Sequence, residues 1–189
     1  GGAHMSVLER LLGRQHEKGL SIAQLRKRDL RHGILDIEVA AYPVGWSHNV
    51  FVSEIDQMRS GTRHYVVARQ DGNIVGYAGV WFAVDEAHVT NVAVDPDARR
   101  QGVARALMLH LAEVAVERGC VAWTLEVRLS SYGAQRLYEE FGFESAGVRQ
   151  RYYDNVEDAI VMWCHDIQGD DYRTRLNTIR EATHDSAGE

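Results

Sequence analysis

The segment from Asn91 to Arg105, which reads NVAVDPDARRQGVAR, constrains the fold of this chain more than any other part of the sequence. A predicted strand ends with the apolar run from Val92 to Val94, and the Asp95-Pro96 pair then breaks it. A long apolar stripe with helical spacing starts near Gly102, after an arginine-rich connection. The segment therefore predicts a strand, a basic loop and a helix in direct succession.

The start of this predicted helix is a candidate anion site. Small residues at Gly102 and Ala104 let a ligand approach the backbone, and the unpaired amides of the first turn lie at the positive end of the helix dipole. Arg99, Arg100 and Arg105 concentrate positive charge there, so a pyrophosphate is a suitable ligand. Neither the three-glycine dinucleotide pattern nor a Gly-Lys-Ser/Thr sequence is present. An ordinary turn with a solvated basic surface is the alternative.

Periodicity along the 189 residues predicts a single mixed α/β domain. A hairpin turn is expected at Asp71-Gly72, and Tyr42-Pro43 should stop a helix. The expected strands span 20–25, 64–68, 74–82, 88–94, 121–127, 143–148 and 159–165, and the expected helices span 29–41, 50–58, 102–118 and 133–141.

Both ends of the sequence carry segments outside this pattern. Residues 1–5 read as the remnant of an expression tag, and 6–19 as a helical extension carrying Leu8 and Leu12. The main domain is expected over 20–167. Residues 168–189 form a tail in which Tyr172, Leu176 and Ile179 would share one side of a helix.

Composition excludes several classes of protein. Lysine and arginine number 21 and aspartate and glutamate 27, which gives a net charge of −6 and disfavours a direct nucleic-acid partner. No apolar run approaches the roughly 18–20 residues of a membrane helix, and no signal peptide opens the chain. The nine histidines and two cysteines show no ligand spacing, so we expect no metal and a soluble, cytoplasmic protein without a membrane partner.

Two side chains are candidates for acid–base chemistry. Glu126 lies within an apolar strand, where burial should raise its pKa towards that of a general base. A glutamate on the solvated face, or one paired with Arg128, is the alternative. Tyr138 follows on the next helix and could protonate a departing thiolate, although core packing beside Leu137 and Phe141 explains a tyrosine equally well.

Taken together, these pieces resemble the GNAT superfamily of acetyl-CoA-dependent N-acetyltransferases. Arg99-x-x-Gly102-x-Ala104 matches the pyrophosphate motif Q/R-x-x-G-x-G/A of that superfamily. The chain is most similar to the bacterial ribosomal-protein-alanine N-acetyltransferases of the RimI type, over about 20–165. This likeness includes NVAVDP, TLEVR, LYEEFGF, RQRYY and EDAIVMW, and the Gly-Trp-Ser that ends at Ser47.

The resemblance implies a GNAT fold: one α/β (α+β) domain whose central, mostly antiparallel, twisted sheet is flanked by helices and splayed to hold acetyl-CoA. Glu126 then matches the proton acceptor for the attacking amine, and Tyr138 matches the proton donor to the coenzyme A thiolate. Acetyl-CoA is the cosubstrate. The coenzyme-binding positions are Val92, Ala93, Val94, Arg99, Arg100, Gln101, Gly102, Val103, Ala104, Arg105 and Ser131, of which Ser131 replaces the family's usual asparagine.

The acceptor is expected to be a polypeptide N-terminus. Tyr152 and Tyr153, in the turn between the last two strands and close to Asp154, would form an aromatic and acidic rim facing Trp46. The resemblance points to the N-terminal alanine of a ribosomal small-subunit protein. Three alternatives remain: a lysine side chain, a small-molecule amine, or a non-catalytic acetyl-CoA sensor. A fourth interpretation is that the aromatic residues only close the end of the sheet. No oligomeric state is predicted.

Overall fold

A computed structural model describes residues 19–42, 44–153 and 157–186 and contains a seven-stranded sheet. The strand order is β1-β2-β3-β4-β5-β7-β6. Neighbouring strands are antiparallel except for β4 and β5. The strands are β1 (Leu20–Gln24), β2 (Arg63–Gln70), β3 (Asn73–Ala83), β4 (Glu86–Val94), β5 (Ala122–Arg128), β6 (Glu144–Tyr153) and β7 (Glu157–His165).

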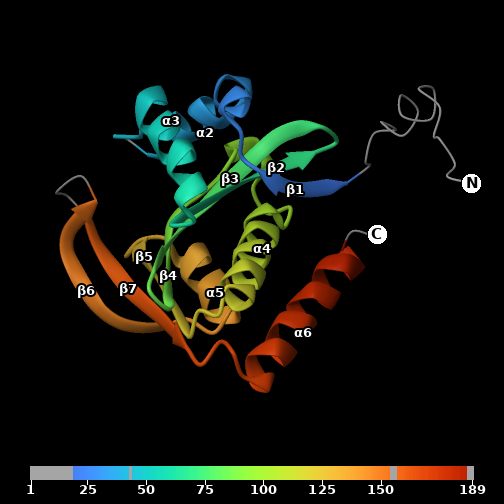
Figure 1. Cartoon of the computed structure of the whole chain (residues 1–189), viewed down its shortest axis with the longest axis vertical. Coiled ribbons are helices and arrows are strands. Elements are labelled where there is room, and N and C mark those ends of the chain that lie inside the picture. Colours follow the sequence, from blue (N-terminus) through green and yellow to red (C-terminus); the bar gives the residue numbers. More distant parts are fainter. Residues whose placement is uncertain (1–18, 43, 154–156, 187–189) are drawn as a thin grey trace, which may run out of the picture.

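Helices cover the two faces of this sheet and create two apolar cores (Figure 1). The larger core lies under α4 (Val103–Glu117), α5 (Tyr132–Glu140) and α6 (Asp170–Ser186). The smaller core lies under α2 (Ile34–Ala41) and α3 (His48–Gln57). Short 3-10 turns complete the chain at η1 (Lys27–His32), η2 (Met58–Ser60) and η3 (Pro96–Ala98). The predicted mixed α/β class is confirmed.

The parallel pair β4 and β5 separates soon after it begins. Glu86, Ala87 and His88 pair with Ala122, Trp123 and Thr124, and no further pairs follow between these strands. Beyond this point β5 continues along β7, while β4 continues along β3. The sheet is therefore splayed at its centre, as the resemblance implied, and the facing edges of the two strands border an opening.

A β-bulge in β4 lies at the point of separation. Val89 pairs with Val80 and Asn91 pairs with Gly79, which leaves Thr90 as an extra residue on β4. Val89 packs into the larger core, whereas Ala93 packs into the smaller one. Residues separated by an even number normally face the same side of a strand, so the extra residue reverses which side chains face which core.

Two expected boundaries were wrong. The helix expected over 29–41 is interrupted at Gly33, whose φ of 145° separates η1 from α2, and an added Cβ there would lie 3.1 Å from the side chain of Ile74. The strand expected over 143–148 continues to Tyr153 with a register shift between Arg149 and Tyr153. Tyr152 and Tyr153 therefore lie in β6 rather than in a turn, and Asp154 lies outside the described residues.

The hairpin and the last helix agree with their predicted positions. Asp71 and Gly72 both have positive φ, as a type I′ hairpin turn requires. The residues Tyr172, Leu176 and Ile179 are buried on one side of α6, which runs beside α4 (Figure 1). The helix expected within 6–19 falls almost entirely outside the described residues. None of the helices described is long and apolar enough to cross a membrane.

Candidate active site

The opening between β4 and β5 holds a cavity of about 350 Å³. Glu126 of β5, Tyr138 of α5 and the residues of β4 from Val89 to Val94 line this cavity. Tyr138 is 8% exposed and packs edge-to-face on Phe143. The cavity brings together eight of the predicted site residues: Val92, Ala93, Val94, Arg99, Glu126, Ser131, Tyr138 and Tyr152.

The other predicted coenzyme-binding residues lie at the start of α4, outside the lining of this cavity. Gly102 caps the helix with a φ of 79°, and Arg100 also has a positive φ, of 64°, so the loop turns sharply into the helix. Gln101 is exposed in this loop, while the side chain of Val103 is buried in the larger core. The amides of the first turn, including that of Ala104, have no partner within an α-helix and are available to an anion.

Arg105 forms an ion pair with a neighbouring helix. Its guanidinium lies 2.9 Å from the carboxylate of Glu140 on α5. This ion pair joins α4 to α5, which borders the cavity, and offsets part of the positive charge. Arg99 and Arg100 are both exposed and carry the remaining charge of the loop.

Glu126 lies in a network of charged groups. Its Oε2 is 2.6 Å from Nε2 of His88, and its Oε1 accepts a hydrogen bond of 3.3 Å from Arg149. Burial raises the pKa of Glu126, but the hydrogen bond and charge of His88, together with Arg149, outweigh burial and lower the pKa below its usual value. The expected rise in the pKa of Glu126 was therefore wrong. Arg128 lies 3.3 Å from the carboxylate of Glu157.

A second hollow lies beside Glu126, between the α2–α3 loop and β6. Trp46 and Tyr152 both line it, with Glu38, Tyr42 and Asn91 among its other walls. The Arg149 guanidinium stacks over the Tyr152 ring at 4.3 Å. Tyr153 follows in β6 and pairs with Glu157 across the hairpin, but its side chain lies outside the described residues. The structure thus places Trp46 and Tyr152 along one hollow.

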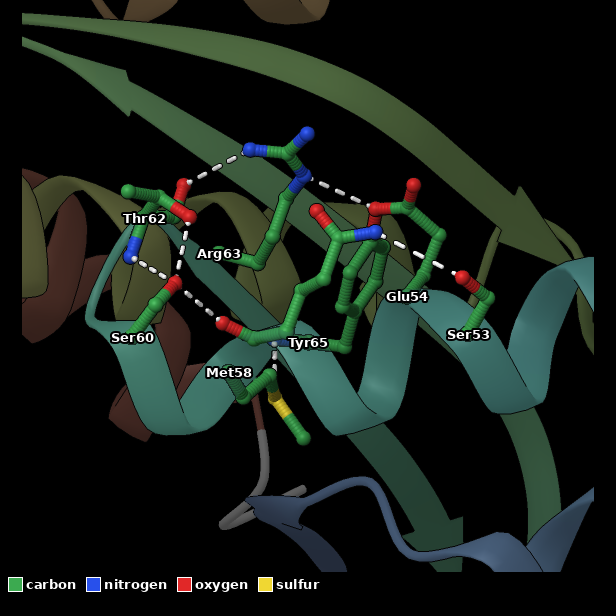
Figure 2. Close-up of polar contacts among 8 residues, drawn as sticks. Ser53, Glu54, Met58, Ser60, Thr62, Arg63 and Tyr65 are labelled. Atoms are coloured by element: carbon green, nitrogen blue, oxygen red, sulfur yellow. Dashed lines mark hydrogen bonds and ion pairs between the residues drawn. The ribbon is translucent and has the colours of Figure 1, made fainter.

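Trp46 is held by the anchoring of α3 on the sheet. Its ring packs edge-to-face on Phe51 and Tyr65, with centroids 5.3 and 6.1 Å away. Glu54 of α3 accepts hydrogen bonds of 2.9 Å from both Arg63 and the Tyr65 hydroxyl (Figure 2). The wall that carries Trp46 is therefore fixed to β2 by polar contacts beneath it.

Sequence reasoning missed Glu38, His88, Asn91 and Arg149. Helical spacing was the available signal for Glu38, because Ile34 and Glu38 are four residues apart and belong to the same buried face. No such signal existed for His88 and Arg149, which reach Glu126 from two other strands. Among the described residues, no group of three or more His, Cys, Asp or Glu side chains could hold a metal ion.

Comparison with known families identifies this arrangement. A model described as the Acetyltransferase (GNAT) family matches residues 31–143. These residues include the splayed strands β4 and β5, which line both hollows. The chain belongs to the GNAT acetyltransferase family. GNAT enzymes use acetyl-CoA, so the chain is an acyltransferase.

A curated relative and a solved structure show which members of the family this chain resembles. A protein of Escherichia coli (strain K12) named [ribosomal protein bS18]-alanine N-acetyltransferase is 38% identical over 146 residues, which cover 75% of this chain and 95% of that protein. The crystal structure of the ribosomal-protein-S18-alanine N-acetyltransferase from Escherichia coli has 36% identity and a TM-score of 0.69, covering 78% of this chain and 94% of that one. The splayed GNAT sheet is thus shared with these relatives.

A more distant structure shares the fold alone. The PaiA N-acetyltransferase from Thermoplasma acidophilum, solved in complex with coenzyme A, has 15% identity and a TM-score of 0.62. The match covers 78% of this chain and 99% of that one. A GNAT fold of this size therefore accommodates coenzyme A in that protein.

Proposed function

We propose that this enzyme transfers an acetyl group from acetyl-CoA to the α-amine of a polypeptide N-terminus, with an N-terminal alanine of a ribosomal small-subunit protein as acceptor. One observation carries the proposal: Glu126 lines both the cavity between β4 and β5 and the hollow beside Trp46 and Tyr152. Acetyl-CoA bound in the cavity and an amine bound in the hollow would meet at the carboxylate of Glu126. The activities named for the Escherichia coli relatives support the same acceptor.

The residues at the splay suit acetyl-CoA, which supplies an acetyl group activated as a thioester. The β4 edge from Val92 to Val94 has no partner on β5 and presents backbone groups to an extended pantetheine arm. One amide there would polarise the thioester carbonyl as its oxygen gains charge. The pyrophosphate would lie on the first-turn amides of α4 near Gly102, with Arg99 and Arg100 beside it. Ser131, at the start of α5, borders the same cavity.

The proposed chemistry is a direct attack of the amine on the thioester. The nitrogen forms a bond to the acetyl carbon, and the bond from that carbon to sulfur breaks. Glu126 accepts the proton that the nitrogen loses, and Tyr138 gives its phenolic proton to the departing sulfur. The low pKa of Glu126 is compatible with this role, because nitrogen becomes acidic once it is bonded to the acetyl carbon.

The open hollow favours a peptide end as the acceptor. Trp46 supplies apolar area on one wall, Tyr152 lies on the other, and Arg128 borders the space between them. A chain of net charge −6 also attracts basic ribosomal proteins over a distance. The proposal places the enzyme in the cytoplasm, where such proteins are synthesised.

The proposal is tested with acetyl-CoA and matched peptides, with products identified by mass spectrometry. One peptide begins with a free alanine, and a second has the same sequence with a blocked N-terminus and an internal lysine. Acetylation of the first peptide at its α-amine alone is the expected result. Transfer to lysine alone would overturn the acceptor assignment, and coenzyme binding without any transfer would favour a small amine or a sensor.

A further inference from the structure

Glu38 is a buried carboxylate with one unused oxygen, and it lines the hollow beside Trp46 and Tyr152 in which the proposed acceptor would bind, the acceptor hollow. The residue is 2% exposed, and its Oε1 accepts a hydrogen bond of 2.9 Å from the backbone N–H of Trp46. Its Oε2 is buried and has no hydrogen-bond partner among the described residues. Leaving a buried polar atom unpaired destabilises a protein, so such an atom needs an explanation.

The backbone around Glu38 holds its side chain in this orientation. A Cβ added at Gly45 would lie 2.8 Å from Cγ of Glu38, so the α2–α3 loop packs closely on the glutamate stem. Burial together with the charge of Glu38 raises the pKa of Tyr42 to about 12, as expected for neighbouring groups. The hydroxyl of Tyr42 donates to the carbonyl of Val92 at 3.4 Å. The unused oxygen of Glu38 is therefore part of a constrained wall.

Asn91 places a second unused oxygen in the same hollow. It follows the bulge of β4, is 6% exposed, and its Oδ1 has no partner among the described residues. Glu38 and Asn91 both line the hollow beside Trp46. Their unused atoms are hydrogen-bond acceptors, so the complementary ligand group is a donor with several N–H bonds.

Glu126 is less available for this purpose. Its Oε2 contacts His88 and its Oε1 accepts from Arg149, so both oxygens already have partners. An N-terminal amine, with an ordinary pKa of about 7.7–8.0, arrives at neutral pH largely as an ammonium. The ammonium loses its first proton to water before the nitrogen attacks, and its second to Glu126 as the amide forms. A group that binds the cation before the first loss is therefore needed near Glu126.

We infer that Glu38 and Asn91 form the subsite that receives the ammonium group of the acceptor, an inference that rests on the proposed N-terminal acetyltransferase function. The Glu38 carboxylate pairs with the positive charge, and the Asn91 oxygen accepts one of its N–H bonds. Acetylation removes the charge and leaves a single N–H beside a carbonyl oxygen. The subsite then repels the product, because oxygen faces oxygen. Glu38 thus selects primary amines and favours product release.

The test is the substitution Glu38→Gln, which keeps an oxygen for the Trp46 N–H and removes the charge. We expect the KM for a peptide with a free N-terminal alanine to rise about 10-fold or more, as for a lost charged hydrogen bond. The KM for acetyl-CoA should change less than two-fold. The midpoint of thermal unfolding should not fall, because a buried and incompletely paired charge has been removed.

Asp29→Asn is the matched control. Asp29 is also buried, at 3% exposed, but its two oxygens accept from Arg69 and from the Arg26 amide, and it lies outside the acceptor hollow. We expect this control to lower the unfolding midpoint and to leave the peptide KM unchanged. An unchanged peptide KM in Glu38→Gln would overturn the inference, and so would a parallel rise in the KM for acetyl-CoA.

A binding experiment separates the subsite from the proposed function. Calorimetry with coenzyme A present compares the free peptide with its N-acetylated form, and the wild type should bind the free peptide more tightly. Glu38→Gln, or Asn91→Leu if the first variant folds poorly, should lose most of this preference. A wild type that acetylates no peptide would contradict the proposed function alone. Equal preference in wild type and variants, or no peptide binding by the wild type, would contradict the ammonium subsite.

Discussion

At Glu126, burial and neighbouring charges act on one carboxylate in opposite directions. Burial disfavours the charged form, while His88 and Arg149 stabilise it more strongly. The net result is a carboxylate that stays charged at neutral pH and is oriented by partners from β4 and β6. Its position relative to both hollows, rather than a raised pKa, makes it suitable as the proton acceptor.

The substitution Glu126→Gln tests this role. Glutamine has nearly the same shape and still accepts a hydrogen bond, but it cannot take a proton, so kcat should fall about 100-fold or more. Steady-state kinetics with acetyl-CoA and a free-alanine peptide measure this effect, and the KM for acetyl-CoA should stay within about two-fold. Glu113→Gln is a suitable control, because Glu113 pairs with Arg180 away from both hollows. A kcat equal to that of the control would remove Glu126 from the mechanism.

At the scale of elements, α6 is joined to the sheet by a buried tyrosine as well as by apolar contacts. The Tyr172 hydroxyl donates to the carbonyl of Phe141 at 2.8 Å and accepts from Nε1 of Trp123 at 3.1 Å. Trp123 is fully buried in β5, two residues before Leu125 and three before Glu126. This one hydroxyl therefore connects α6 to the strand that carries the catalytic candidate.

Removing that hydroxyl should destabilise the protein without changing its chemistry. Tyr172→Phe removes the acceptor of the buried Trp123 N–H and leaves the Phe141 carbonyl with only the weaker Cys164 thiol as donor, at 3.7 Å, so it should lower the free energy of unfolding by about 1–3 kcal/mol. Denaturant unfolding measures this loss, which corresponds to roughly 2–4 °C per kcal/mol at this chain length. Tyr132→Phe, at a tyrosine that is 68% exposed on α5, should be nearly neutral. Equal effects at both positions would refute the account of Tyr172.

The elements also explain how far the sequence could predict this structure. Most strands, the hairpin at Asp71-Gly72 and the α4 stripe depend on local pattern, and they were predicted with small errors at their ends, whereas β6 was predicted too short. The break at Gly33 was missed because the apolar spacing continues across it, and the approach of Ile74 from β3 is a long-range contact. The bulge at Thr90 was missed for the same reason, since only pairing with β3 defines it.

The candidate site follows the same division between local and long-range information. Family motifs identified Glu126, Tyr138 and the α4 loop, and the structure places the first two in one cavity. The partners of Glu126 come from other strands, so no local spacing predicts them. Glu38 was detectable through its helical spacing from Ile34, but only the structure identifies its unused oxygen.

At the scale of the whole molecule, the two faces of the sheet border different features. The acceptor hollow lies on the side of α2 and α3, whereas α4, α5 and α6 bury the larger core on the other. Between β2 and α4 this larger side also contains two histidines, His64 and His110, whose rings stack with centroids 5.7 Å apart. Nε2 of His64 is buried without a hydrogen-bond partner among the described residues. Global stability should therefore depend on the protonation of this pair.

Burial lowers the pKa of both histidines, and each is affected by charges on α4 and beyond its end. The neighbouring His110 and Arg118 lower the pKa of His64 further. The charge of Glu113 raises the pKa of His110 and so opposes part of the effect of burial. Above about pH 6.5, the ordinary histidine pKa, neither the folded nor the unfolded state binds these protons. Below it the unfolded state binds them first, so stability falls as the pH decreases towards the lowered folded-state values.

Urea unfolding between pH 7.5 and 5 measures this dependence. The wild type should lose up to about 1.4 kcal/mol per pH unit for each histidine within this window. The double substitution His64→Gln and His110→Gln should flatten the slope, because glutamine does not titrate. His165→Gln, at an exposed histidine that stacks on Trp163, should keep the slope of the wild type. A double variant with an unchanged slope would locate the acid sensitivity elsewhere and would show that protonation of this pair does not oppose folding.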